Sequence, residues 1–61
     1  MRKLTEDIEI GERIIYNNTI LLITDIYESN GEGRGFICTN ETGKESKFNK
    51  SCGTYLETII E

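Results

Sequence analysis

The segment Thr19–Glu28 constrains the fold of this 61-residue chain more than any other part of the sequence. Its side chains follow the period of two that is typical of a β-strand. The first half is apolar on both faces, whereas only one face stays apolar in the second half. Such a strand needs cover on both sides, so we expect it either to bend around a small core or to have one face covered by another chain. One expected face carries Ile20, Leu22, Thr24 and Ile26, and the other carries Leu21, Ile23, Asp25 and Tyr27.

Four further strands are expected around this segment. Alternating apolar residues predict a strand that starts at Ile8 and ends at Tyr16. Asn17-Asn18 then predicts a tight type I′ turn, because Asn tolerates a positive φ better than most residues. After a glycine-rich loop over residues 29–35, strands are expected over residues 36–39, 44–50 and 55–60. We therefore expect an all-β fold, either a five-stranded small barrel or a strongly bent antiparallel sheet.

A resemblance to a known group of folds supports the barrel. Ile10–Asn18, followed by Thr19–Tyr27, resembles the opening hairpin of SH3-like small β-barrels, in which a Gly-Glu/Asp-Arg-Val/Ile step leads into the first strand. That step is Gly11–Ile14 here, and the turn Asn40–Lys44 is similar too. The resemblance covers about residues 8–60 and implies a five-stranded SH3-like small barrel of the kind found in small phage or mobile-element proteins.

The length of the chain allows one domain with one small core. The polar residues 1–7 are expected to form a flexible N-terminal segment, and residues 8–61 the single small β-barrel domain. No apolar run approaches the roughly 20 residues of a membrane span, and the first residues lack the apolar stretch of a signal peptide. We therefore expect no membrane contact and a cytoplasmic location, in the host cytoplasm if the chain is phage-encoded.

The residue types argue against catalysis and against a bound cofactor. The sequence has no histidine, so Ser-His and Cys-His pairs are impossible within one chain. Cys38 and Cys52 are expected to be reduced, buried thiols that act as small hydrophobes, and a single disulfide between them is the alternative. Two thiols alone do not make a zinc site. Gly31–Gly35 leads into an expected strand rather than a helix, which indicates a hairpin loop and not a phosphate-binding loop. We expect no catalytic residues, no cofactor and no metal.

Charge and apolar patterning together favour a protein partner. Eleven acidic residues against seven basic ones give a net charge of −4, which disfavours sequence-independent binding to nucleic acid. The leading hypothesis is a non-catalytic protein-binding module that self-associates as a homodimer and acts by occupying or inhibiting a larger protein. By analogy with small acidic barrels of phages and mobile elements, that protein would belong to a host defence system or be a host enzyme. The candidate residues for self-association or partner binding are Leu21, Ile23, Tyr27, Arg34 and Tyr55.

Two alternatives stay open. The first is a KOW-like or Tudor-like nucleic-acid-binding barrel, which would use Arg34, Lys44, Lys47 and Lys50 with an exposed aromatic ring. The second is an accessory module that only stabilises a complex of other proteins. Nucleic acid is the less favoured partner, because acidic residues lie among these basic ones.

Overall fold

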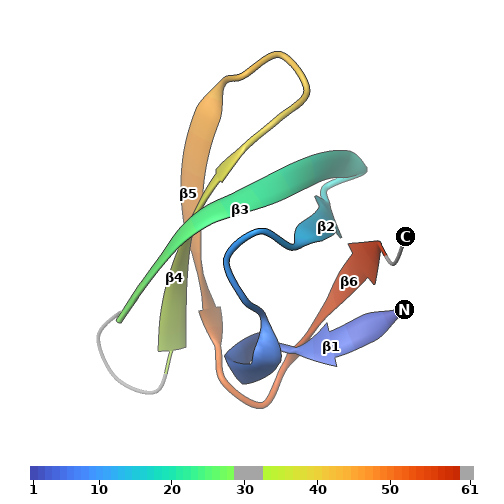
Figure 1. Cartoon of the computed structure of the whole chain (residues 1–61). Coiled ribbons are helices and arrows are strands. Elements are labelled where there is room, and N and C mark those ends of the chain that lie inside the picture. The colour runs from blue at the N-terminus through green and yellow to red at the C-terminus, as the bar shows by residue number, and fades with distance from the viewer. Residues whose placement is uncertain (29–32, 60–61) are drawn as a thin grey trace.

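The computed structural model describes residues 1–28 and 33–59, which form one curved antiparallel sheet (Figure 1). Within these ranges the strand order across the sheet is β1-β6-β2-β3-β4-β5, so β1 and β5 are its two edges. The elements are β1 (Arg2–Leu4), the 3₁₀-helix η1 (Thr5–Asp7), β2 (Arg13–Tyr16), β3 (Thr19–Glu28), β4 (Gly33–Thr39), β5 (Glu45–Ser51) and β6 (Tyr55–Ile59). The all-β prediction is confirmed, in its form of a strongly bent sheet that is not closed into a barrel.

The curvature brings the two halves of the sheet to face one another. In Figure 1, β3 runs from one half of the sheet to the other. One half consists of β4 and β5, and the other consists of β2, β6 and β1. The rings of Tyr16 on β2 and Phe48 on β5 are stacked, with their centroids 4.3 Å apart and 9° between their planes. Because β2 and β5 are not neighbours in the sheet, this contact joins the two halves across the inside of the curve.

The hairpin between β2 and β3 forms as the sequence predicts. Asn17 and Asn18 have φ values of 51° and 61°, and Tyr16 pairs with Thr19 at the end of the ladder. Two consecutive positive φ values are what a type I′ turn requires. Before this hairpin the expected strand is shorter than predicted, because β2 begins only at Arg13. Residues 8–12 instead turn over the core, and the N–H of Gly11 donates to the carbonyl of Ile23 at 2.9 Å.

The strand β3 has the predicted bounds and contains a bulge. Its register with β4 shifts between Ile23 and Asp25, so the pairing skips Thr24. Ile23 is buried before the shift, and Ile26 packs against the same core after it, whereas Asp25 is exposed. We predicted that Ile26 lies on the face opposite to Ile23, which is wrong, because one extra residue reverses the alternation of side chains.

The core lies inside the curve of the sheet. Two threonines are buried with it, and both have hydrogen-bond partners: the hydroxyl of Thr5 donates to the carbonyl of Thr54 at 3.1 Å, and that of Thr58 donates to the carbonyl of Met1 at 2.8 Å. These bonds remove most of the cost of burying a polar side chain. The buried apolar residues are Ile8, Ile14, Leu21, Ile23, Phe36, Cys38 and Leu56.

The two cysteines differ in their surroundings. Cys38 is fully buried, with its Sγ 3.5 Å from the carbonyl oxygen of Ser46. Cys52 is exposed next to Gly53, whose φ of 86° belongs to the turn between β5 and β6. Both thiols are free. The prediction of a buried cysteine is confirmed for Cys38 and is wrong for Cys52, because that position lies at the tip of a surface turn.

The first seven residues are part of the sheet, although we expected them to precede the domain as a flexible segment. β1 pairs with β6, with Lys3 opposite Leu56, and Thr5 is fully buried. The carbonyl of Thr5 accepts a hydrogen bond from Nη1 of Arg34 at 3.0 Å. The groups that hold this segment lie tens of residues away in the sequence, so its own polar pattern contains no sign of them.

Candidate functional site

The five residues that the sequence predicts for partner binding do not gather on one surface. Leu21 is 6% exposed and Ile23 is 1% exposed, so both side chains belong to the protein's own core. Their burial agrees with the expectation of a strand bent around a core, and it removes both from the set available for contact. The remaining three, Tyr27, Arg34 and Tyr55, keep some exposure.

Tyr27 of β3 contacts residues of β4 and β5 on the outer side of the sheet. Its ring lies over Gly35 on β4 so closely that a Cβ at Gly35 would overlap the ring atoms. Its hydroxyl donates to Oδ1 of Asn49 on β5 at 3.1 Å. Gly35 is therefore required as a close-approach position inside a strand, whereas the sequence predicts that it belongs to a glycine-rich loop. Residues 29–32 of that predicted loop lie outside the described part of the chain.

The side chain of Arg34 connects β4 to the segment that follows β1 through hydrogen bonds. Its Nη1 donates to the carbonyls of Thr5 at 3.0 Å and Ile8 at 3.3 Å. The guanidinium carbon lies 5.7 Å from the ring centroid of Phe36, within the range of a cation–π contact. Arg34 also lines, together with Ile10 and Tyr27, a groove of about 460 Å³. Of the predicted residues, the structure thus brings together Tyr27 and Arg34.

Tyr55 lies apart from that groove, on β6. It is 54% exposed, and the guanidinium carbon of Arg2 lies 5.4 Å from its ring centroid. Leu4 on β1 is directly opposite Tyr55 in the ladder. The ring thus packs at the β1 edge, where Arg2 covers it in part.

Two charged side chains connect the N-terminal segment to the rest of the sheet. Nζ of Lys3 donates to Oε1 of Glu12 at 2.6 Å, and this hydrogen bond raises the pKa of Lys3. Oε1 of Glu6 accepts a hydrogen bond from the N–H of Gly53 at 2.9 Å, and this bond lowers the pKa of Glu6. Both shifts favour the charged form of the side chain, as expected when a partner stabilises that form.

Three aliphatic side chains form an apolar patch on the outer side of β2 and β3. These residues, Ile15, Ile20 and Leu22, are called here the outer apolar patch and are 39%, 38% and 40% exposed. Ile15 is directly opposite Ile20 in the ladder, and Leu22 is opposite Arg13. On the other side of Arg13 lies the partly buried Ile59 of β6, so the apolar surface extends over three strands.

Charges of both signs lie around the outer apolar patch. Arg13 lies within it, and Glu57 of β6 is directly opposite Ile15. Glu41 and Arg13 both line a hollow of about 200 Å³ at the edge of the patch. A surface that carries an apolar centre and both signs of charge is able to complement a second copy of itself.

The candidate residues predicted from the sequence do not include the outer apolar patch, because the prediction named residues of β3 that the structure places on the buried side. Leu21 and Ile23 were predicted as contact residues, whereas Ile20 and Leu22 are the exposed ones. In this half of the strand both faces are equally apolar, so no signal within the strand identifies the inner face. The direction in which the sheet curves decides it.

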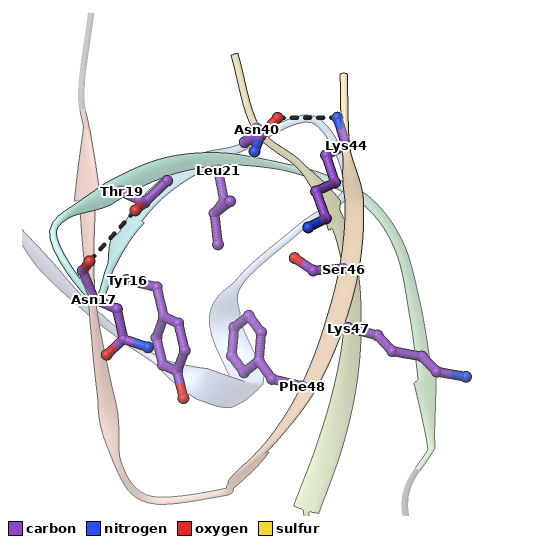
Figure 2. Close-up of a pocket in the computed structure, with 9 residues that line it drawn as sticks. All are labelled: Tyr16, Asn17, Thr19, Leu21, Asn40, Lys44, Ser46, Lys47 and Phe48. Atoms are coloured by element: carbon purple, nitrogen blue, oxygen red, sulfur yellow. Dashed lines mark hydrogen bonds between the residues drawn. The ribbon is translucent and has the colours of Figure 1, made fainter. Parts of the chain in front are cut away.

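A second hollow, of about 340 Å³, lies between the β2–β3 hairpin and β5 (Figure 2). Tyr16, Leu21 and Phe48 form its apolar part, and Lys44 and Ser46 point toward it. Figure 2 shows Lys47 pointing away from the hollow. No acidic residue is among the lining residues, which are Tyr16, Asn17, Thr19, Leu21, Asn40, Lys44, Ser46, Lys47 and Phe48.

The segment that consists of Lys44 and β5 is basic in an otherwise acidic chain. Residues 44–51 contain three lysines and one glutamate, which is a net charge of +2. The rest of the sequence, with four basic and ten acidic residues, carries −6. Of the cations expected to serve a nucleic-acid site, Lys44, Lys47 and Lys50 therefore lie on one segment, whereas Arg34 is bonded to backbone carbonyls.

Comparisons with known protein families, with curated proteins and with solved structures found no match to this chain. Within residues 1–28 and 33–59 no helix has the length and hydropathy that crossing a lipid bilayer requires. Nor do three or more His, Cys, Asp or Glu side chains gather in these ranges into a group that could hold a metal ion.

Proposed function

We propose that this chain is a non-catalytic protein-binding module that self-associates through the outer apolar patch. The observation that carries the proposal is the exposure of Ile15, Ile20 and Leu22, each about two fifths exposed, at neighbouring positions of paired strands. Contiguous aliphatic surface of this kind gains free energy when another surface excludes water from it.

The occupant that fits this surface best is a second copy of the chain. A twofold contact that pairs Arg13 of one copy with Glu57 or Glu41 of the other is compatible with their positions, since all three lie in or beside the patch. An interface of standard size takes about 800 Å² per partner. That is about a fifth of the accessible surface of 4253 Å², so such a dimer would use the charged surroundings of the patch as well as the patch itself.

The finer identity of the fold is part of the same proposal. The meander β2-β3-β4-β5, with the last strand β6 returning beside β2, supports an SH3-like arrangement to which β1 is added at the edge. The resemblance of the opening hairpin to small phage and mobile-element barrels further suggests that the module occupies or inhibits a larger protein, such as a host defence component or a host enzyme. A larger partner of this kind would compete with self-association for the outer apolar patch.

Sedimentation equilibrium over a concentration series tests the self-association. We expect a reversible dimer at high micromolar concentration in the unmodified chain. The substitution Leu22→Lys places a charge in the outer apolar patch and is expected to shift the protein to monomer, because desolvating a lysine without a partner opposes association. A strict monomer at the highest concentration in the unmodified chain would contradict the proposal.

The matched control is Ile10→Lys. Ile10 is 60% exposed and lies in the turn before β2, outside the outer apolar patch. This variant undergoes the same chemical change at an exposed aliphatic residue, so it should dimerise as the unmodified chain does. Equal loss of dimer in both variants would mean that the added charge acts through the whole molecule and not through the patch. Circular dichroism of both variants checks that they remain folded.

A further inference from the structure

The strand β5 is an edge of the sheet and is long enough to accept another strand. It has seven residues and pairs only with β4 in the described part of the chain. In an antiparallel edge strand, about every second residue directs its N–H and C=O away from the neighbouring strand. Most side chains of β5 are exposed, so a further chain can approach this edge.

We infer that β5 binds an extended acidic peptide of another protein, which adds to the sheet as a further strand. Backbone hydrogen bonds supply the general affinity in this mode of binding, and side-chain pockets supply the selectivity. The inference uses the β5 edge and not the outer apolar patch, so it goes beyond the self-association proposed above.

The charge distribution of the chain favours a negatively charged partner at β5. The segment of residues 44–51 carries +2 whereas the rest of the chain carries −6. Among the described residues no carboxylate forms an ion pair with Lys44, Lys47 or Lys50. An acidic peptide is attracted to β5 and repelled by the remaining surface, which directs it to this edge.

The same lysines argue against a second copy of β5 as the occupant. Lysine on an edge strand is a common way in which proteins prevent edge-to-edge association, because two such edges repel each other. A partner segment with glutamate or aspartate at alternate positions would meet Lys47 with the opposite charge, because Lys47 points away from the hollow that Phe48 lines (Figure 2). The occupant is therefore a different chain with acidic character.

The hollow beside β5 gives the added strand a place for an apolar side chain. Phe48 and Tyr16 form its wall, and Lys44 points toward it (Figure 2). Its volume of about 340 Å³ is at the lower end of the range for small-molecule pockets and is enough for a valine or phenylalanine side chain. The expected ligand thus alternates acidic residues with medium or large apolar ones.

A synthetic heptapeptide that alternates glutamate with valine and phenylalanine is the probe. Titrated into the ¹⁵N-labelled chain at low salt, it should shift the amide resonances of β5 and slow hydrogen exchange at the outward-facing amides of that strand. A peptide of the same pattern with lysine in place of glutamate should not bind. An analogue that is N-methylated at alternate residues keeps its charges but loses the N–H groups that a strand needs, so its binding should be lost.

Two variants form a matched pair on the two edges of the sheet. Lys47→Glu on β5 should weaken binding by about fivefold or more, since it removes one attraction and adds one repulsion. Arg2→Glu on β1 makes the same charge change on the opposite edge and should alter the affinity by less than about twofold. Equal effects would show that net charge, and not the β5 edge, determines binding.

The following outcomes overturn the inference: no binding by the acidic peptide, equal binding by the N-methylated analogue, or resonance shifts centred on Ile15, Ile20 and Leu22. Tighter binding by a single-stranded oligonucleotide than by the acidic peptide would also overturn it and would point to nucleic acid. Repeating the titration with the Leu22→Lys variant separates the two proposals, because binding at β5 should persist in a chain that no longer dimerises.

Discussion

The two faces of β3 carry similar side chains but lie in different surroundings. Leu21 and Ile23 on the inner face are at most 6% exposed, whereas Ile20 and Leu22 on the outer face are 38% and 40% exposed. The difference arises from the curvature of the sheet (Figure 1), because the side chains on the inside of the curve are buried and those on the outside are exposed. Apolar composition alone therefore does not distinguish a core face of a strand from an exposed apolar face. Substitutions on the two faces are the direct way to test the distinction.

The largest effect is expected at Ile23. Replacing Ile23 with Ala removes buried methyl groups from a side chain that is 1% exposed, and it should cost about 2–5 kcal/mol of folding free energy. Leu22→Ala on the outer face should change the stability of the monomer by about 0.5 kcal/mol or less. Urea unfolding followed by circular dichroism measures both values. Similar losses at the two positions would mean that the outer face is covered within the monomer.

Not all of the outer side of the sheet is open to solvent, because the ring of Tyr27 packs on Gly35 there and is expected to stabilise the fold. Gly35→Ala places a Cβ against the ring of Tyr27 and should cost about 1–3 kcal/mol. The double variant with Tyr27→Ala removes the ring that causes the overlap, so its loss should be smaller than the sum of the two single losses. The free energies of unfolding of the unmodified chain, the two single variants and the double variant, measured in urea, give this double-mutant cycle. Additive losses would contradict the close packing of the ring on β4.

The smallest effect is expected at Glu6, an exposed carboxylate outside both faces of β3. Its pKa is lowered in the folded state by the hydrogen bond from the N–H of Gly53, so the charged form stabilises folding. That contribution is fully present above the ordinary pKa of 4.5 and is lost as the pH falls through the lowered value. The difference in stability between the unmodified chain and Glu6→Gln should therefore shrink in acid. A difference that is constant with pH would show that the ionised group has no such role.

Most of the sheet could be predicted from local pattern. The bounds of β3 and the left-handed turn at Asn17-Asn18 follow from alternation and from the tolerance of Asn for positive φ. The pairing of β1 with β6 could not be predicted, because it joins segments more than fifty residues apart. The place of Gly35 inside a strand is not predictable for a similar reason, because the ring that requires a glycine there comes from the neighbouring strand.

The five residues predicted for partner binding are distributed over the core and the surface of the structure. Tyr27 and Arg34 do line one groove, but Leu21 and Ile23 are core residues and Tyr55 lies elsewhere. The three lysines in residues 44–51 are visible in the sequence, but the acidic residues near them argue against a basic binding surface there. Its position on an edge strand beside a hollow became clear only when the strand order was known.

Side-chain alternation and turn chemistry are local properties, so the sequence was sufficient to predict short antiparallel strands and, to within one residue, where β3 and β5 begin and end and where β6 begins. Only the tertiary structure decided which face of β3 is enclosed, which strands are edges and which buried polar groups find partners. Those features depend on the register and curvature of strands that are distant in the chain. A shift of one residue, such as the bulge at Thr24, moves the side chains that follow it to the other face.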